Sequence, residues 1–134
     1  LGISNYAWQT DVSGLPKAGA GSSFTSRDML KWGNLILNEG KYNGKQHIPA
    51  EFIKQATATL YTNRQGSTYG YFWWGSKIQI DGKVMHCTTG RGAGGQLIFV
   101  IKDLDLVIVT TSHNKGMGKA LQSIPSEIIP AFIY

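Results

Sequence analysis

Apolar residues in the first half of the chain recur at the three- and four-residue spacing of amphipathic helices. The clearest run covers residues 25–40, where a Thr-Ser pair can cap the first turn, Asp28 lies in that turn and Gly40 can end the helix. Pro49 at a first helical position opens a second, shorter run over residues 49–60. The sequence therefore predicts two helices in this half.

The segments around these helices have the composition of loops and turns. Residues 1–20 are rich in Gly, Ser and Pro and have no periodicity, which predicts an irregular but well-packed segment anchored by Tyr6 and Trp8. Residues 42–45, Tyr-Asn-Gly-Lys, predict a tight turn between the two helices.

Beyond the middle of the chain the pattern becomes that of strands. Residues 69–74 predict an aromatic strand, and residues 78–86 predict a hairpin that turns at Asp81-Gly82. Residues 97–101 and 106–111 are nearly continuous apolar runs, typical of strands buried on both faces. The pattern predicts an α/β protein of the α+β type, with an antiparallel sheet of about four strands flanked by helices.

The tail, residues 117–134, returns to helical spacing. Pro125 and Pro130 restrict this helix, because each must lie near a helix start or a kink. These elements divide the chain into residues 1–66, a loop with two helices, and residues 67–134, the antiparallel strands with a closing helix.

Composition and charge exclude several classes of protein. The 134 residues are 42% hydrophobic, 16% charged and 11% aromatic, which excludes a disordered chain and suffices for a core. No apolar run approaches the roughly 18 residues that span a bilayer. The formal net charge is +5, but the basic residues are scattered singly, which favours a solvated basic surface over nucleic-acid binding. The first residue is not Met, which predicts a processed product or a piece of a longer protein.

The histidines and the cysteine do not indicate a metal site or a thiol nucleophile. His47, His86 and His113 are far apart in sequence and have no ligand-spaced neighbours, so ordinary surface or hydrogen-bonded histidines are favoured. The single cysteine, Cys87, cannot form an internal disulfide and is interpreted as a buried strand residue. We predict neither a metal nor a cofactor.

A glycine-rich segment covers residues 88–96, Thr-Thr-Gly-Arg-Gly-Ala-Gly-Gly-Gln. It lacks the GxxxxGK[ST] pattern of a phosphate loop, and a strand rather than a helix follows it. Two roles stay open. The glycines make a bulged turn, which the segment alone favours, or they let a substrate approach the N–H groups near Gly90 and Arg91, which would stabilise an oxyanion.

Two short motifs of penicillin-recognising serine hydrolases also occur. Ser112–Lys115 spells S-x-x-K, and Tyr61–Asn63 spells Y-x-N. In a working S-x-x-K the serine and the lysine share one face at a helix start, so that the amine can take the hydroxyl proton. Ser112 instead follows a predicted strand, and Gly116 follows the lysine directly. Both matches are therefore interpreted as coincidence.

The order of features along essentially the whole chain resembles the serine β-lactamase-related hydrolases. This family includes class C β-lactamases, D-alanyl-D-alanine carboxypeptidases, esterases and 6-aminohexanoate-dimer hydrolases. The segments that carry the resemblance are AGAGSSFTSRDMLKWGNLILNEGKYNGKQHIPAEFIKQAT, YGYFWWGS and GRGAGGQLIFVIKDLDLVIVTTS. They are most similar to the branch with a G-G-Q-x-I-F-V signature. The resemblance implies a β-lactamase/transpeptidase-like fold, of which this chain is the C-terminal portion.

The resemblance also implies which part of an active site is present. The family order is S-x-x-K, then a tyrosine motif, then K-T-G, and only the third motif has a counterpart in its proper place here. The implied oxyanion and substrate-cleft residues are Thr88, Thr89, Gly90 and Arg91, with His86 and Gly92 in support. The nucleophilic serine and its lysine and tyrosine partners are implied to lie upstream of this chain. Because Thr88 replaces the lysine that helps bind the β-lactam carboxylate, ester or amide substrates are favoured.

Two hypotheses follow for the function. In the first, the chain is the C-terminal part of a serine hydrolase that uses acyl-enzyme chemistry on a small or peptide-like substrate, and it is inactive alone. In the second, it is a non-catalytic module that binds peptidoglycan-like peptides or another chain, or a fragment that self-associates through unpaired strand edges. The resemblance favours a periplasmic or extracellular location.

Overall fold

A six-stranded antiparallel sheet with the strand order β10-β9-β8-β7-β6-β5 forms the centre of the computed structural model, which describes residues 1–116 and 118–133. Its strands are β5 (Tyr61–Thr62), β6 (Thr68–Tyr69), β7 (Trp74–Ile80), β8 (Lys83–Arg91), β9 (Leu97–Ile101) and β10 (Leu106–Thr110). Two short pairs lie outside it: β1 (Ala7–Trp8) with β2 (Ser22–Ser23), and β3 (Lys41–Tyr42) with β4 (Lys45–Gln46). The predicted antiparallel sheet is confirmed, with six strands instead of about four.

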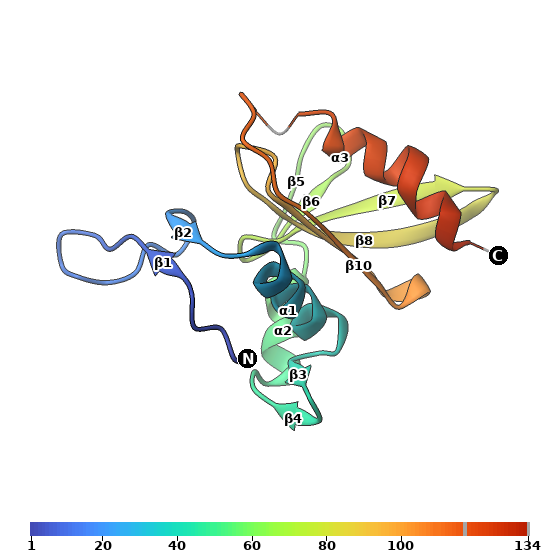
Figure 1. The fold of residues 1–134 in the computed structure, drawn as a ribbon. Coiled ribbons are helices and arrows are strands. Elements are labelled where there is room, and N and C mark those ends of the chain that lie inside the picture. The colour runs from blue at the N-terminus through green and yellow to red at the C-terminus, as the bar shows by residue number, and fades with distance from the viewer. Residues whose placement is uncertain (117, 134) are drawn as a thin grey trace.

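Helices cover both faces of this sheet (Figure 1). Helices α1 (Ser26–Leu37) and α2 (Ala50–Thr57) lie on one face, where Ile36 and Ile53 pack with Val100 of β9. The C-terminal helical run lies on the other face and consists of α3 (Ala120–Ser123), the π-helical turn η2 (Ile124–Ile128) and the 3-10 turn η3 (Ile129–Phe132). The fold class predicted from the sequence, an antiparallel sheet flanked by helices, is therefore confirmed.

The larger core cluster lies between the sheet and the C-terminal helical run. Its fully buried members come from β8, β9 and the turns η2 and η3: Met85, Cys87, Leu97, Phe99, Ile101, Ile124 and Ile129. Pro125 and Pro130 are the second residues of η2 and η3, so each lies at the start of a helical turn, as predicted. Met117 and Tyr134, the ends of the predicted tail helix, lie outside the described residues.

Helix α1 lies very close to the sheet because it carries a glycine where the two layers meet. A Cβ at Gly33 would collide with a methyl group of Val107 on β10 and would lie 3.0 Å from Cγ2 of Ile98 on β9. Only a residue without a side chain fits this approach. The helix and strands β9 and β10 are thus in direct backbone-to-side-chain contact.

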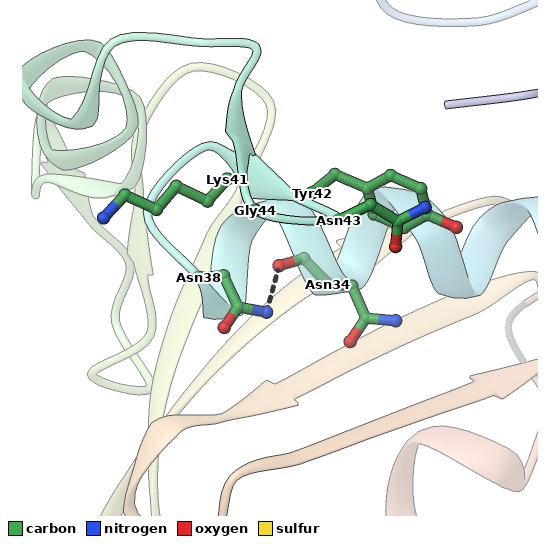
Figure 2. A pocket seen from close by; sticks show the side chains of 6 residues that line it. All are labelled: Asn34, Asn38, Lys41, Tyr42, Asn43 and Gly44. Atoms are coloured by element: carbon green, nitrogen blue, oxygen red, sulfur yellow. Dashed lines mark hydrogen bonds between the residues drawn. The ribbon is translucent and has the colours of Figure 1, made fainter.

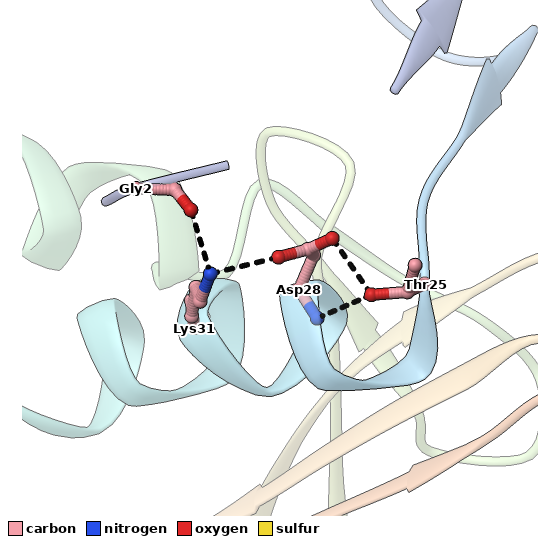
Figure 3. A network of polar contacts seen from close by, with 4 residues as sticks. All are labelled: Gly2, Thr25, Asp28 and Lys31. Atoms are coloured by element: carbon pink, nitrogen blue, oxygen red, sulfur yellow. Dashed lines mark hydrogen bonds and ion pairs between the residues drawn. The ribbon is translucent and has the colours of Figure 1, made fainter. Parts of the chain in front are cut away.

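The start of α1 is fixed by a cap and a small polar network (Figure 3). The Thr25 hydroxyl accepts a hydrogen bond from the Asp28 N–H at 3.2 Å and donates one to Asp28 Oδ2 at 2.7 Å. Lys31 Nζ donates to Asp28 Oδ1 at 2.8 Å and to the carbonyl of Gly2 at 3.0 Å. The hydrogen bond from Lys31, followed by that from Thr25, lowers the pKa of Asp28 below its ordinary value.

Replacing Thr25 by alanine is expected to lower the free energy of unfolding by about 1 kcal/mol, because an N–H in the first turn of α1 loses its side-chain acceptor. Urea denaturation at neutral pH measures this change. Thr59→Ala is the matched control, since Thr59 is exposed between α2 and β5. Equal losses in the two variants would contradict the capping role.

The predicted tight turns are confirmed. Asn43 and Gly44 join β3 to β4 with φ of 48° and 74°, and Asp81 and Gly82 join β7 to β8 with φ of 50° and 78°. Positive φ at both central residues is the signature of the two-residue hairpin turn that Asn-Gly and Asp-Gly favour. Gly40, with φ of 88°, follows α1 as the predicted left-handed terminator.

Two predicted helix limits and one strand are corrected. Pro49 is the N-cap of α2 rather than its first residue, and α2 ends at Thr57 instead of extending to residue 60. Residues 69–74 are not one strand: they turn at 70–73, where Phe72 has φ of 64° and the Gly70 N–H donates to the Trp73 carbonyl at 2.8 Å. Gly70 allows this turn to lie against α2, because a Cβ there would collide with the Ala56 carbonyl oxygen, which accepts the Tyr71 N–H at 2.8 Å.

Two predictions about burial are wrong. Strand β10 is not buried on both faces: all five of its residues are half-buried, because it forms an edge of the sheet and has only β9 as a neighbour. The segment 1–20 is exposed rather than well packed and extends away from the sheet (Figure 1). The rings of Tyr6 and Trp8 nevertheless lie near one half-buried ring, with centroids 6.0 and 5.7 Å from that of Phe24.

Two further observations concern the organisation of the chain. The predicted division between residues 66 and 67 falls in the turn between β5 and β6 and stays a prediction. None of the helices described in residues 1–116 and 118–133 has the length and apolarity needed to cross a membrane.

Candidate functional site

The implied cleft residues lie at the end of β8, a central strand with β7 on one side and β9 on the other. Thr88 and Gly90 are opposite Val100 and Ile98 of β9, so they face α1 and α2. Thr89 and Arg91 alternate with them and face the C-terminal helical run. The four residues are therefore contiguous in the strand, but their side chains divide between two faces.

The neighbours of Gly90 on its face of the sheet are apolar. The indole of Trp73 lies over Gly90, since a Cβ at Gly90 would be 3.3 Å from Cζ3 of that ring and 3.8 Å from Cβ of Ile98. A side chain at position 90 would therefore require the Trp73 ring to shift by a few tenths of an ångström.

On the opposite face, Arg91 is held by two contacts. Its Nε donates to the hydroxyl of the fully buried Thr89 at 2.9 Å, and its guanidinium carbon lies 4.8 Å from the ring centroid of Trp74. The ring of Trp74 in turn lies 4.6 Å from that of Tyr69. Partial burial lowers the pKa of Arg91, although a guanidinium remains cationic at any ordinary pH.

The backbone N–H of Arg91 has a special position in the ladder. The Gly92 N–H donates to the Gln96 carbonyl at 2.7 Å across the β8–β9 turn. Because amides alternate between neighbours in an antiparallel sheet, the N–H groups of Thr89 and Arg91 point toward β7. Strand β7 begins at Trp74, which is opposite Thr89, so Arg91 lies beyond its start. Its amide is directed at the 70–73 turn and not into a strand pair.

The two supporting residues have structural partners. The His86 N–H donates to Oδ2 of Asp103 at 3.2 Å, and the imidazole of His86 is exposed. Gly92 closes the turn through its bond to Gln96. Cys87 is a buried strand residue, as predicted, and burial raises the pKa of its thiol to about 12, which keeps it protonated and unreactive.

The other sequence candidates do not come together. His47 follows β4, His86 lies in β8 and His113 follows β10, and within residues 1–116 and 118–133 no three His, Cys, Asp or Glu side chains form a group that could hold a metal ion. Ser112 follows β10 without a helix, and its hydroxyl donates to the Gly94 carbonyl at 2.8 Å. Tyr61 lies in the edge strand β5. The interpretation of S-x-x-K and Y-x-N as coincidence agrees with this geometry.

Two shallow polar hollows lie away from β8, beside the β3–β4 hairpin. The larger, of about 480 Å³, lies between the end of α1 and the hairpin (Figure 2). Its lining residues are Asn34, Asn38, Lys41, Tyr42, Asn43 and Gly44. The second, of about 400 Å³, shares Tyr42 and Asn43 with it. The lining residues of neither hollow include an activated nucleophile, so we do not interpret either hollow as a catalytic site.

Sequence reasoning missed three residues around the motif: Trp73, Trp74 and Gln96. The two tryptophans were assigned to one continuous strand, whereas the turn at 70–73 places Trp73 over Gly90 and Trp74 under Arg91. The signal for Gln96 was available in the sequence, because glutamine directly follows the glycines that it contacts.

The fold is that of part of a β-lactamase-like hydrolase. A solved structure, the "Putative 6-aminohexanoate-dimer hydrolase from Bacillus anthracis", matches with a TM-score of 0.65 and 26% sequence identity over 92% of this chain. The match covers 32% of that protein, so this chain spans about a third of its length. An uncharacterized protein of Alkalihalophilus pseudofirmus is 36% identical over 52 residues, which are 37% of this chain and 16% of that protein. No protein-family model matches the chain.

Proposed function

We propose that this chain is the C-terminal part of a serine hydrolase that cleaves an ester or amide through an acyl-enzyme, and that it supplies the oxyanion side of the cleft. The position of the Arg91 amide is the observation that carries the proposal. It lies at the end of a central strand, points beyond the start of β7 and is adjacent to Gly90. A backbone N–H in such a place, outside the pairing of β7 with β8, can stabilise a developing oxyanion.

The nucleophile belongs to another part of the complete protein. Ser112 is unsuited to the role, because its hydroxyl is engaged by the Gly94 carbonyl and Lys115 does not share a helical face with it. The likeness to a hydrolase three times as long supports a division of the active site between this chain and an upstream part. The isolated chain is accordingly inactive in this proposal.

The substrate is an uncharged ester or amide rather than an anionic β-lactam. Thr88 stands where the family has a lysine, and the neighbours of Gly90 on the same face of β8, Trp73 and Ile98, are apolar. A substrate carboxylate would find no cation among these neighbours. The Trp73 ring over Gly90 favours a substrate with an apolar group beside the reacting carbonyl.

Proline at position 91 is expected to lower kcat of the complete gene product by about 100-fold or more toward p-nitrophenyl butyrate, because it removes one oxyanion N–H. Arg91→Ala keeps this N–H and is expected to lose only a few-fold. Since the amide faces no strand, proline costs no ladder bond here, and thermal melts of both variants check that they fold. Equal losses of activity in the two variants would contradict the role of the amide.

A non-catalytic, self-associating module is the second candidate, and one observation favours it. Strand β10 is an edge strand whose sequence, Leu-Val-Ile-Val-Thr, contains none of the charges or prolines that normally protect an edge. Sedimentation of the isolated chain tests association at this edge. Hydrolysis of the ester by the complete gene product would exclude a purely non-catalytic role.

A further inference from the structure

The glycine-rich turn between β8 and β9 is folded around one side chain, that of Gln96. A Cβ at Gly92 would lie 2.8 Å from Oε1 of Gln96, and a Cβ at Gly94 would lie 2.8 Å from its Nε2. Both distances are shorter than real Cβ contacts. The side chain of Gln96 therefore occupies the space that two of the glycines leave open.

The amide group of Gln96 is bonded at both ends. Its Oε1 accepts from the Gly94 N–H at 3.1 Å, and its Nε2 donates to the Ser112 carbonyl at 2.6 Å. Its own backbone carbonyl accepts the Gly92 N–H at 2.7 Å. One residue thus connects the start of the turn, its middle and the segment that follows β10.

The last residue of β10 and the segment after it also form hydrogen bonds to the turn. The Ser112 hydroxyl and the Asn114 N–H both donate to the Gly94 carbonyl, at 2.8 and 3.0 Å, and the Thr110 hydroxyl donates to the Gly95 carbonyl at 3.1 Å. Glycine has the largest backbone freedom of all residues, so a turn rich in glycine would otherwise be the most mobile part of the hairpin. The hydrogen bonds from Thr110, Ser112 and Asn114 restrict the conformation of this turn.

We propose that Gln96 is a positioning residue that fixes the end of β8 and thereby the direction of the Arg91 amide. Gly92 directly follows Arg91 in the chain; its N–H donates to the Gln96 backbone carbonyl, and the Gln96 side chain fills the space beside its Cα. A turn that opens at Gly92 releases the last residue of β8, whose N–H has no strand partner to keep it aligned. The catalytic consequence of this alignment rests on the proposed function, whereas the positioning itself can be measured in the isolated chain.

Amide hydrogen exchange in the ¹⁵N-labelled 134-residue chain tests the positioning. In Gln96→Met, which keeps the side-chain bulk but loses both side-chain hydrogen bonds, the Gly94 amide loses its acceptor and is expected to exchange about ten times faster or more. The Gly92 amide keeps its backbone acceptor but is expected to exchange faster because the turn around it opens, and the Arg91 amide resonance is expected to shift. Gln96→Glu keeps an acceptor for Gly94 but replaces the donor to Ser112 by a carboxylate oxygen that the Ser112 carbonyl repels, so we expect faster exchange at these amides here too. Amides of β7 and the first half of β8 should be unchanged.

Gln79→Met is the control, because Gln79 is exposed on β7. Unchanged exchange at Gly92 in Gln96→Met, or the same increase in Gln79→Met, would overturn the proposal. If Gln96→Met does not fold, hydrogen exchange at the Gly92 and Gly94 amides of Gln96→Glu tests the proposal instead. In the complete gene product, Gln96→Met should lower kcat about tenfold with little change in KM. Faster exchange without a fall in kcat would leave the positioning intact and contradict the proposed function instead.

Discussion

Replacement of Phe99 by alanine is expected to lower the free energy of unfolding by about 3–5 kcal/mol. Phe99 lies in β9 with 2% of its surface exposed, opposite the fully buried Thr89, and belongs to the core between the sheet and the C-terminal helical run. The substitution removes a whole ring from an enclosed space that the surrounding strands cannot refill. Urea denaturation followed by far-UV circular dichroism measures the change.

Phe52→Ala provides the comparison for this prediction. Phe52 lies on α2 with 49% of its surface exposed, and its ring is 6.3 Å from that of Tyr71. The same atoms are removed, but much of the ring is already in water, so the expected loss is about 1 kcal/mol or less. Similar losses in the two variants would show that Phe99 does not lie in the main core.

Above pH 9 the stability of the chain is expected to fall more steeply than that of its Cys87→Ala variant. Burial raises the pKa of Cys87 from 9.0 to about 12 in the folded chain. Between these values the unfolded thiol loses its proton while the folded thiol keeps it, so the stabilising contribution is complete below pH 9 and is lost as the pH rises toward 12. The slope is about 1.4 kcal/mol per pH unit, which amounts to roughly 4 kcal/mol at pH 12.

Urea denaturation at pH 8, 9, 10 and 11 measures the difference between the two proteins. All other ionisable groups are shared by the two proteins, so subtraction isolates the thiol. At pH 8 the free energy of unfolding of the alanine variant should be the lower of the two, because the variant loses buried volume. As the pH rises, the difference between the two free energies should shrink. A difference in the free energy of unfolding that stays constant from pH 8 to pH 11 would contradict the burial of the thiol.

Local chemistry explains which parts of the fold could be predicted from the sequence. The turns at Asn43-Gly44 and Asp81-Gly82 and the cap at Thr25 depend on residues adjacent to one another, so short motifs determine them. The break at 70–73 could not be predicted, because it depends on the Ala56 carbonyl near the end of α2, which is distant in sequence. The half-burial of β10 likewise depends on its position at the edge of the sheet. An apolar run in the sequence does not indicate whether a strand will be central or at an edge.

The candidate site divides in the same way. The position of Thr88, Thr89, Gly90 and Arg91 at the end of a strand followed from the glycine-rich motif and the apolar strand after it. The alternation of their side chains between two faces, and the direction of the Arg91 amide, depend on the register with β7 and β9. Trp73 could not be assigned to this site from sequence, because a non-glycine residue with positive φ, Phe72, turns the chain just before it.

The close contact at Gly33 has a consequence for motion. Because a methyl group of Val107 occupies the place of a Cβ on α1, the helix cannot slide along β9 and β10 without a steric collision. Helix and sheet therefore move as one body. Residues 1–20 are attached differently, since they are mostly exposed and Lys31 of α1 donates a hydrogen bond to the Gly2 carbonyl. A rearrangement of this N-terminal segment would therefore leave the contact between α1 and the sheet intact.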